Sequence, residues 1–336
     1  MNDKNIIEFE DYINLCNDYD KNMDYDNIIH GRYGVTTINS EVLFISKHEN
    51  SLVLLPNNEF SPILYRGQND YYKDCKPSLF RNKDKFFREI SEIKKIEFFN
   101  ILEGLPFIKY LKKATLYNYN FKIDFEAIAQ HYNFETTHLD LTRSKDIAMF
   151  FATTQYKDGE YHLIHKDKEV VLYYLNLKKY YNYKKKILNP IGFQPVKRPD
   201  NQKAFSIILE EEEDFNSLPF VEKEIFTITK DDSKFYYEKF EGGKLLFPDE
   251  PLNNLAKNIQ KKTSLNKNSV LKYCQKNKID YNNFVKELLM RNYSLRENTY
   301  YLSRREIYLL KKNLYNEILD LKSRIKIRFC CEHFET

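Results

Sequence analysis

Four short polar clusters in the chain contain residue types that could bind an anionic ligand or stabilise a charged intermediate. The first is Arg66, Gly67 and Gln68, directly after the apolar residues 63–65. An arginine that ends a strand can point its guanidinium into a cleft while the following glycine lets the backbone turn away. The planar guanidinium binds phosphate through parallel hydrogen bonds, which the ammonium group of lysine cannot do. The sequence therefore indicates a phosphate-binding arginine, with a structural ion pair of Arg66 as the alternative.

The second cluster occupies residues 127–142 and is rich in groups that donate and accept hydrogen bonds. Its polar members include Gln130, His131, Thr136, Thr137, His138, Asp140 and Thr142. Thr142 or Ser144 fits the N-cap of a helix over residues 146–153, because a hydroxyl oxygen can accept a hydrogen bond from the first helical turn. The two histidines and the aspartate have no evident third partner for a metal ion, so no metal site is predicted.

The third and fourth clusters follow later in the chain. Arg198 and Gln202 precede an apolar segment at 205–209, and a run of four glutamates follows it at 210–213. Such a run is usually a solvated loop, yet Glu210 or Glu212 could act as an acid or stabilise a positive charge at the strand end. The fourth cluster is a Gly-Gly turn with an apolar segment over residues 242–251, and its pattern favours a packing edge.

Apolar periodicity predicts the elements that must position these clusters. Strands are expected over residues 51–55, 62–66, 170–177 and 205–209, and helices over residues 6–18, 86–103, 125–131 and 146–153. The Asp158–Gly159 pair predicts a hairpin. Two further helices are expected over residues 270–293 and 304–329. The predicted fold class is α+β, with a helical C-terminal region.

The charge distribution divides the chain. Residues 251–336 hold 18 Lys and Arg against 8 Asp and Glu, although the whole chain has a net charge of only +4. The change coincides with a Pro- and Asn-bearing stretch, which predicts a domain boundary near residue 257. The basic helices beyond it could present a solvated face or a nucleic-acid surface.

Composition excludes several classes of protein. The chain has 8 glycines in 336 residues and neither a P-loop nor a Rossmann glycine motif. Its five scattered cysteines predict no disulfide framework and no zinc site. Neither a signal peptide nor an apolar run long enough to span a membrane is evident, so the sequence predicts a cytoplasmic protein without membrane association.

Taken in order, the clusters resemble the FRG domain, a bacterial and phage domain named for its Phe/Tyr-Arg-Gly motif. That motif is Tyr65, Arg66 and Gly67, and the later R-x-x-x-Q element is Arg198 and Gln202. The central stretch of the family corresponds to residues 127–142, with matches at Gln130, His131, Tyr132, Thr136, Leu139, Asp140 and Thr142, and with departures at Asn133, Thr137, His138 and Leu141. The resemblance predicts an FRG domain over residues 5–257 and a basic helical region over residues 258–336.

The motif order is also similar to that of ADP-ribosyltransferases, which carry an Arg-Gly at a strand end, a central Ser/Thr motif and a later strand-borne Glu or Gln. This likeness implies a mixed, ADP-ribosyltransferase-like β core with helices, followed by a basic all-α C-terminal region. It implies NAD as the cofactor, with no metal. The implied NAD-binding residues are Arg66, Gly67, Gln68, His131, Thr136, Asp140 and Arg198, and the implied catalytic candidates are Gln202, Glu210 and Glu212.

Three functions follow as hypotheses. The first is an NAD-dependent ADP-ribosyltransferase-like toxin or anti-phage effector that modifies a protein or nucleic acid and has an antitoxin or phage trigger as partner. The second is a non-catalytic FRG sensor that only binds its ligand in phage defence. The third is a nucleic-acid-binding protein that uses the basic C-terminal helices, which would show binding that weakens steeply with salt.

Overall fold

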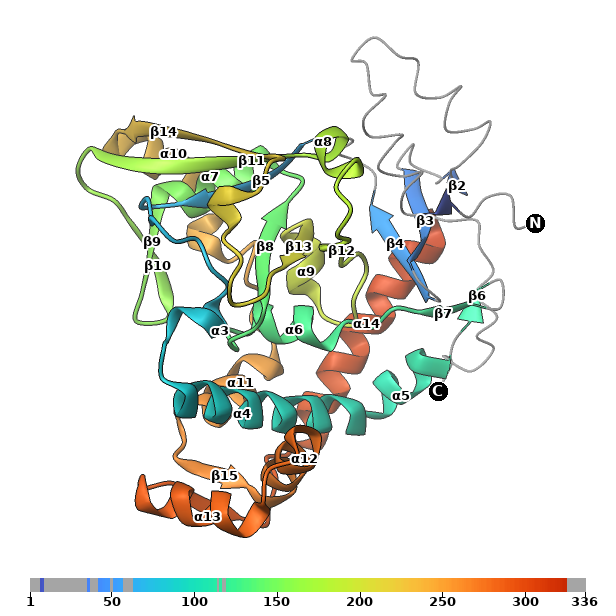
Figure 1. Cartoon of the computed structure of the whole chain (residues 1–336). Helices are drawn as coiled ribbons and strands as arrows, with labels where there is room; N and C mark the ends of the chain where they lie inside the picture. The colour runs from blue at the N-terminus through green and yellow to red at the C-terminus, as the bar shows by residue number, and fades with distance from the viewer. Residues whose placement is uncertain are drawn as a thin grey trace.

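The computed structural model describes residues 7–8, 35–36, 42–48, 51–56, 63–113, 115–116 and 119–324. Its centre is a six-stranded sheet in which every pair of neighbours is antiparallel. The strands, in sheet order, are β12 (Leu188–Pro190), β13 (Ala204–Ile208), β8 (His138–Thr142), β5 (Ile63–Gln68), β11 (Lys168–Asn176) and β14 (Val221–Ile228). The predicted strands at 62–66, 170–177 and 205–209 are thereby confirmed, and all three lie in this sheet (Figure 1).

The central sheet is nearly split between β5 and β8. Six residue pairs join β5 to β11, whereas Tyr65–Thr142 is the one described pair between β5 and β8. Helix α7 (Lys145–Thr153) packs against β5 beside this junction. A Cβ at Gly67 would lie 1.7 Å from the carbonyl oxygen of Ala148 in α7, so the strand and the helix can meet only where the side chain is absent.

The helices next to the central sheet agree with the sequence expectations. Helix α7 begins after Ser144, whose hydroxyl accepts a hydrogen bond from the amide of Ile147, which decides between the two predicted caps. Helix α6 occupies the predicted Phe125–His131 and has Asp124 as its N-cap. Predicted helix 86–103 is α4 (Lys85–Gly104).

Shorter elements complete the part of the chain that precedes the C-terminal region. These are α3 (Ser78–Arg81), α5 (Pro106–Lys113), α8 (Leu177–Tyr181), α9 (Lys197–Asn201), η3 (Phe215–Ser217), α10 (Lys230–Lys239) and η4 (Glu241–Gly243). The predicted hairpin is confirmed as β9 (Thr154–Lys157) and β10 (Glu160–Leu163), with positive φ at Asp158 and Gly159. The glutamates 210–213 form a turn and a loop, as expected.

A second sheet is formed by four described strands that precede β5 in the chain and by two that lie between β5 and β8. It comprises β1 (Ile7–Glu8), β2 (Val35–Thr36), β3 (Val42–His48), β4 (Ser51–Pro56), β6 (Thr115–Leu116) and β7 (Tyr119–Phe121). The predicted strand at 51–55 is confirmed as β4. The helix predicted over residues 6–18 is wrong where the structure describes it, because Ile7 and Glu8 pair with β3; the rest of that range lies outside the described residues.

The C-terminal region is more varied than the sequence predicted. It contains α11 (Pro251–Lys261), β15 (Ser264–Asn266), α12 (Lys267–Asn277), α13 (Tyr281–Met290), β16 (Ser294–Arg296) and α14 (Arg304–Arg324). The all-α expectation is wrong because β15 and β16 form a parallel pair. The single helix predicted over 270–293 is two helices, because Lys278 adopts a left-handed conformation that ends α12 and Asp280 then caps α13.

The C-terminal helices pack on α4. Leu255 of α11 and Leu310 of α14 share one apolar cluster with Phe98 and Leu102 of α4. Figure 1 shows α12, α13 and β15 on the far side of α4 from the central sheet. Glu97 of α4 also accepts two hydrogen bonds from Arg296, at 2.5 and 2.6 Å. The predicted boundary near residue 257 lies within α11 and stays a prediction.

No described helix is both long and apolar enough to cross a membrane.

Candidate functional site

A cavity of about 330 Å³ lies where three of the predicted clusters meet. Polar side chains of its wall come from the end of β5, from the last turn of α6 together with strand β8, and from Gln202 just before β13. The wall is formed by Tyr65, Arg66, Gly67, Gln68, Asn69, Tyr72, Arg81, Gln130, His131, Asp140, Leu141, Thr142, Phe151, Thr154, Tyr156, Tyr161, Gln202 and Ala204. We call this space the central cavity. Of the predicted site residues, it brings together Arg66, Gly67, Gln68, His131, Asp140 and Gln202.

Arg66 links β5 to β8 beside the near-split in the sheet. One terminal nitrogen of its guanidinium donates a hydrogen bond of 2.8 Å to the carbonyl oxygen of Asp140. Its Nε is buried without a hydrogen-bond partner. Gln68, two residues on, likewise has a buried side-chain oxygen without a partner. Both groups are therefore held in the wall with hydrogen-bonding capacity left over.

Asp140 is held by a chain of hydrogen-bonded side chains. The amide of Gln130 donates a hydrogen bond of 3.2 Å to Oδ2 of Asp140, and the hydroxyl of Thr136 donates to the amide oxygen of Gln130. Oδ1 of Asp140 is buried and has no partner. Thr136 is fully buried and does not line the cavity, so its place is to orient Gln130.

His131 contributes a neutral imidazole to the wall. Burial lowers the pKa of His131, and the carboxylate of Asp140 opposes that shift. Its Nε2 has no partner. Its ring therefore has a nitrogen left to form a hydrogen bond with a bound molecule.

Gln202 ends helix α9 and stands just before β13. Its side chain is buried, and its amide nitrogen donates a hydrogen bond of 3.1 Å to the carbonyl oxygen of Leu246. Gln202 is thus at the cavity, but one of its donors is already used to hold the 246–249 segment.

Arg198 lies behind the central cavity rather than in its wall. Its guanidinium donates to the carbonyl oxygen of His131 at 2.7 Å and to the side chain of Asn253 at 2.6 Å, and it stacks over Tyr132. This buried side chain fixes the end of α6 to α11. Arg198 therefore positions the end of α6 that carries His131, and its predicted contact with a cofactor stays a prediction.

The predicted catalytic carboxylates are not at the central cavity. Glu210 and Glu212 are exposed and follow β13, whereas Gln202 precedes it. A five-residue strand separates its two ends by roughly 17 Å. The strand that brings Gln202 to the cavity therefore carries these two glutamates away from it.

Sequence analysis missed the aromatic part of the wall. Tyr156 and Tyr161 are cross-strand partners in the β9–β10 hairpin, and their ring centroids are 4.9 Å apart. Burial raises the pKa of Tyr161, which keeps its hydroxyl protonated. The signal was present in the sequence, since tyrosines placed symmetrically about the Asp158–Gly159 turn must share one face of the hairpin.

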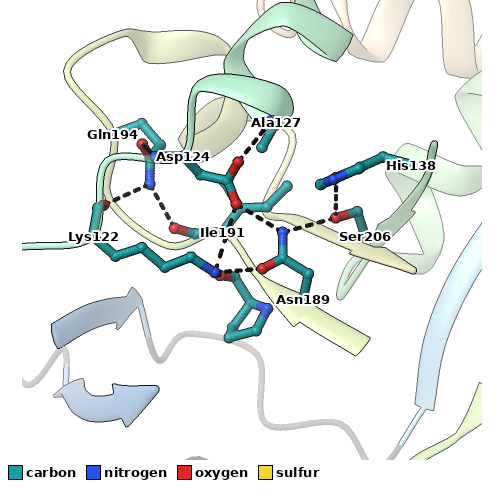
Figure 2. A network of polar contacts seen from close by, with 9 residues as sticks. Lys122, Asp124, Ala127, His138, Asn189, Ile191, Gln194 and Ser206 are labelled. Atoms are coloured by element: carbon teal, nitrogen blue, oxygen red, sulfur yellow. Dashed lines mark hydrogen bonds and ion pairs between the residues drawn. The ribbon is translucent and has the colours of Figure 1, made fainter. Parts of the chain in front are cut away.

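A second polar cluster lies at the other end of α6 (Figure 2). Asp124 accepts hydrogen bonds from the amide of Ala127 and the side chain of Asn189, both at 2.9 Å, and pairs with Lys122. Asn189 also donates to the hydroxyl of Ser206, which lies 2.9 Å from Nδ1 of His138. We call Lys122, Asp124, His138, Asn189, Gln194 and Ser206 the support network. It fixes α6 to β8, β12 and β13.

In the described part of the chain no group of three or more His, Cys, Asp or Glu side chains is placed to hold a metal ion.

Comparison with known proteins gives one match. The model of the FRG domain matches residues 61–160, which include Arg66, His131 and Asp140 but not Arg198 or Gln202. No curated protein and no solved structure matches the chain. The wider extent predicted from the sequence, residues 5–257, stays a prediction. Residues 61–160 of this chain are an FRG domain.

Proposed function

We propose that the chain is an NAD-dependent ADP-ribosyltransferase-like enzyme that modifies a macromolecular acceptor and uses the central cavity as its active site. One observation carries the proposal. Four residues that line this one space each carry a buried polar atom without a hydrogen-bond partner, namely Nε of Arg66, the side-chain oxygen of Gln68, Nε2 of His131 and Oδ1 of Asp140. Leaving buried polar atoms unpaired costs about 1–3 kcal/mol each, so their concentration in a cavity favours a polar ligand that pairs with them.

The chemistry of the wall suits the nicotinamide end of NAD. The guanidinium of Arg66 matches a negatively charged pyrophosphate. The free oxygen of Gln68 can accept a hydrogen bond from a carboxamide, and the rings of Tyr156 and Tyr161 offer flat surfaces to a planar heterocycle. The cavity volume of about 330 Å³ is at the lower end of ligand pockets, which run from roughly 300 to 1,000 Å³. It therefore fits the reacting half of a dinucleotide better than the whole molecule.

In this proposal Asp140 stabilises the developing positive charge, a role that the sequence analysis gave to Glu210 or Glu212. When the bond between nicotinamide and the ribose breaks, its electron pair leaves with nicotinamide and the ribose becomes an oxocarbenium ion. The free carboxylate oxygen of Asp140 stabilises that positive charge. The acceptor then bonds to the same ribose carbon, and its proton passes to the neutral ring of His131.

A second candidate function is a non-catalytic module that binds the nucleotide. The observation in its favour is that Gln202, an amide, stands at the start of β13, and that the described wall of the central cavity contains no glutamate. An amide cannot supply the charge that a carboxylate would. The two candidates differ in whether nicotinamide is released from bound NAD.

The test is to measure nicotinamide release from NAD by the purified chain, with and without cell lysate as a source of acceptors. We expect release by the wild type and a loss of about 100-fold or more in Arg66→Ala, because a preorganised electrostatic contact of this kind is worth several kcal/mol. Arg304→Ala, which removes an exposed arginine at the start of α14, is the matched control and should act like the wild type.

No release under either condition, together with NAD binding that depends on Arg66, would favour the binding module. Release that is unchanged in Arg66→Ala would contradict both candidates.

A further inference from the structure

A second cavity of about 730 Å³ adjoins the central cavity. The two share three wall residues, Gln68, Tyr72 and Arg81. The second cavity extends from there along α3 and the start of α4 to the glutamate turn after β13. We call it the basic cavity, because its wall includes Lys76, Arg81, Lys83 and Arg88 against the two carboxylates of Asp74 and Glu211.

The existing contacts leave part of this positive charge without a counterion. Arg88 pairs with the carboxylate of Glu211 at 2.7 Å, and Lys76 donates to the backbone carbonyl of the same residue at 2.5 Å. Lys83 has no hydrogen-bond or ion-pair partner among the described residues. The glutamate turn therefore engages two of the four cations, and the exposed Lys83 has its charge left for a ligand.

Arg81 stands at the junction of the two cavities. Its Nε donates a hydrogen bond of 3.0 Å to the carbonyl oxygen of Lys76, which fixes the guanidinium, and no described carboxylate forms an ion pair with it. Loss of hydration and then the positive charge of Arg66 lower the pKa of Arg81. Two guanidinium groups that repel each other at the border of two cavities form an arrangement that a doubly charged anion would stabilise.

We propose that the basic cavity is a phosphate-binding subsite, and that it takes the diphosphate and the adenosine side of the dinucleotide whose nicotinamide end occupies the central cavity. The identity of this ligand rests on the proposed function; the phosphate chemistry of the subsite does not. Arg66 contacts the diphosphate from the central cavity, Arg81 contacts it from the junction of the two cavities, and Lys83 provides a further charge. The 330 Å³ of the central cavity leaves the rest of a dinucleotide outside it, and the basic cavity is an adjoining space whose wall carries more cations than carboxylates.

The probes are ADP, inorganic pyrophosphate and adenosine, each titrated into the purified full chain by calorimetry. We expect ADP and pyrophosphate to bind and adenosine to bind far more weakly. Lys83→Gln should weaken ADP binding by about tenfold, equivalent to ~1.4 kcal/mol, and Arg81→Gln by at least as much. Lys276→Gln, which neutralises an exposed lysine on α12, is the control and should bind ADP like the wild type.

Unchanged ADP affinity in both variants would overturn the subsite. Binding of a single-stranded oligonucleotide that requires Lys83, without binding of ADP, would overturn its assignment to a dinucleotide. None of these titrations involves cleavage of NAD. ADP binding that depends on Arg81 and Lys83 therefore supports the subsite even if no nicotinamide is released. The subsite proposal is refuted, and the proposed function is not, if nicotinamide release depends on Arg66 but ADP affinity is unchanged in the Arg81 and Lys83 variants.

Discussion

The two ends of helix α6 carry two polar clusters with opposite properties. At its N-terminus the support network pairs each buried polar atom with another side chain or with the backbone, and none of its atoms is among the buried ones left without partners. At its C-terminus the central cavity holds four such unpaired atoms. Both clusters use the same face of β8, since His138 and Asp140 are two residues apart. A network whose polar groups all have hydrogen-bond partners stabilises the fold. Buried polar groups without partners remain available to bind a ligand.

This comparison predicts that the two clusters respond differently to substitution. Changes in the elements that carry the cavity, or in the support network, should lower the free energy of unfolding. Changes to the unpaired groups of the central cavity should remove function and lower stability less than changes in the support network do.

The largest loss of stability is expected where β5 meets α7. Gly67→Ala places a methyl group against the backbone carbonyl of Ala148, which cannot move without displacing the helix. We expect a loss of about 3 kcal/mol in the free energy of unfolding, measured by urea denaturation. Gly104→Ala is the control, because a Cβ there has no atom within 4 Å. Equal stability of the two variants would show that β5 and α7 are not in close contact.

The next effect concerns the support network. Asp124→Ala removes the N-cap of α6 and the acceptor for Asn189, and it leaves Lys122 without its carboxylate. We expect a loss of about 2 kcal/mol by the same measurement. Asp146→Ala, in the exposed first turn of α7, breaks only a surface pair with Lys239 and should cost less than about 1 kcal/mol. If the two variants lost the same stability, the network would not hold α6.

A smaller effect is expected from pH. Burial lowers the pKa of both His131 and His138, while the neighbouring carboxylates of Asp124 and Asp140 oppose the shifts. At these two histidines the folded chain binds fewer protons than the unfolded chain, whose histidines titrate near pH 6.5, so their contribution to stability should fall as the pH drops below about 6.5. His138→Gln should reduce this slope in urea denaturation at pH 7.5 and pH 5.5. A slope that stays unchanged would mean that His138 is not buried as a neutral ring.

The smallest effect is predicted for the glutamate turn. Glu212→Gln changes an exposed side chain outside the central cavity, so nicotinamide release and stability should both match the wild type. A large loss of release in this variant would restore the sequence-based assignment and would separate catalysis from the central cavity.

Local signals explain how much of this arrangement the sequence could predict. The strand that ends at Arg66, the helix at Phe125–His131 and the Ser144 cap each follow from residues adjacent in the chain. The near-split in the sheet depends on pairing between distant segments, which no local pattern encodes. The aromatic pair Tyr156 and Tyr161 lies in a local hairpin, but the position of that hairpin beside the central cavity is set by the rest of the fold. The glutamates show the same limit, because periodicity located strand β13 but could not tell which of its ends meets the cavity. In the C-terminal region, periodicity found helical residues but missed the break at Lys278.

Asp140→Asn tests the central claim most directly, because it removes a charge from the cavity and keeps the shape of the side chain. The measurement is the rate of nicotinamide release from NAD under single-turnover conditions, with the affinity for ADP and the unfolding midpoint recorded on the same preparation. We predict that release falls by about 100-fold or more, while ADP affinity and stability stay near wild type. Wild-type release in this variant, or a collapse of stability that equals that of Asp124→Ala, would contradict the assignment of the unpaired carboxylate to function.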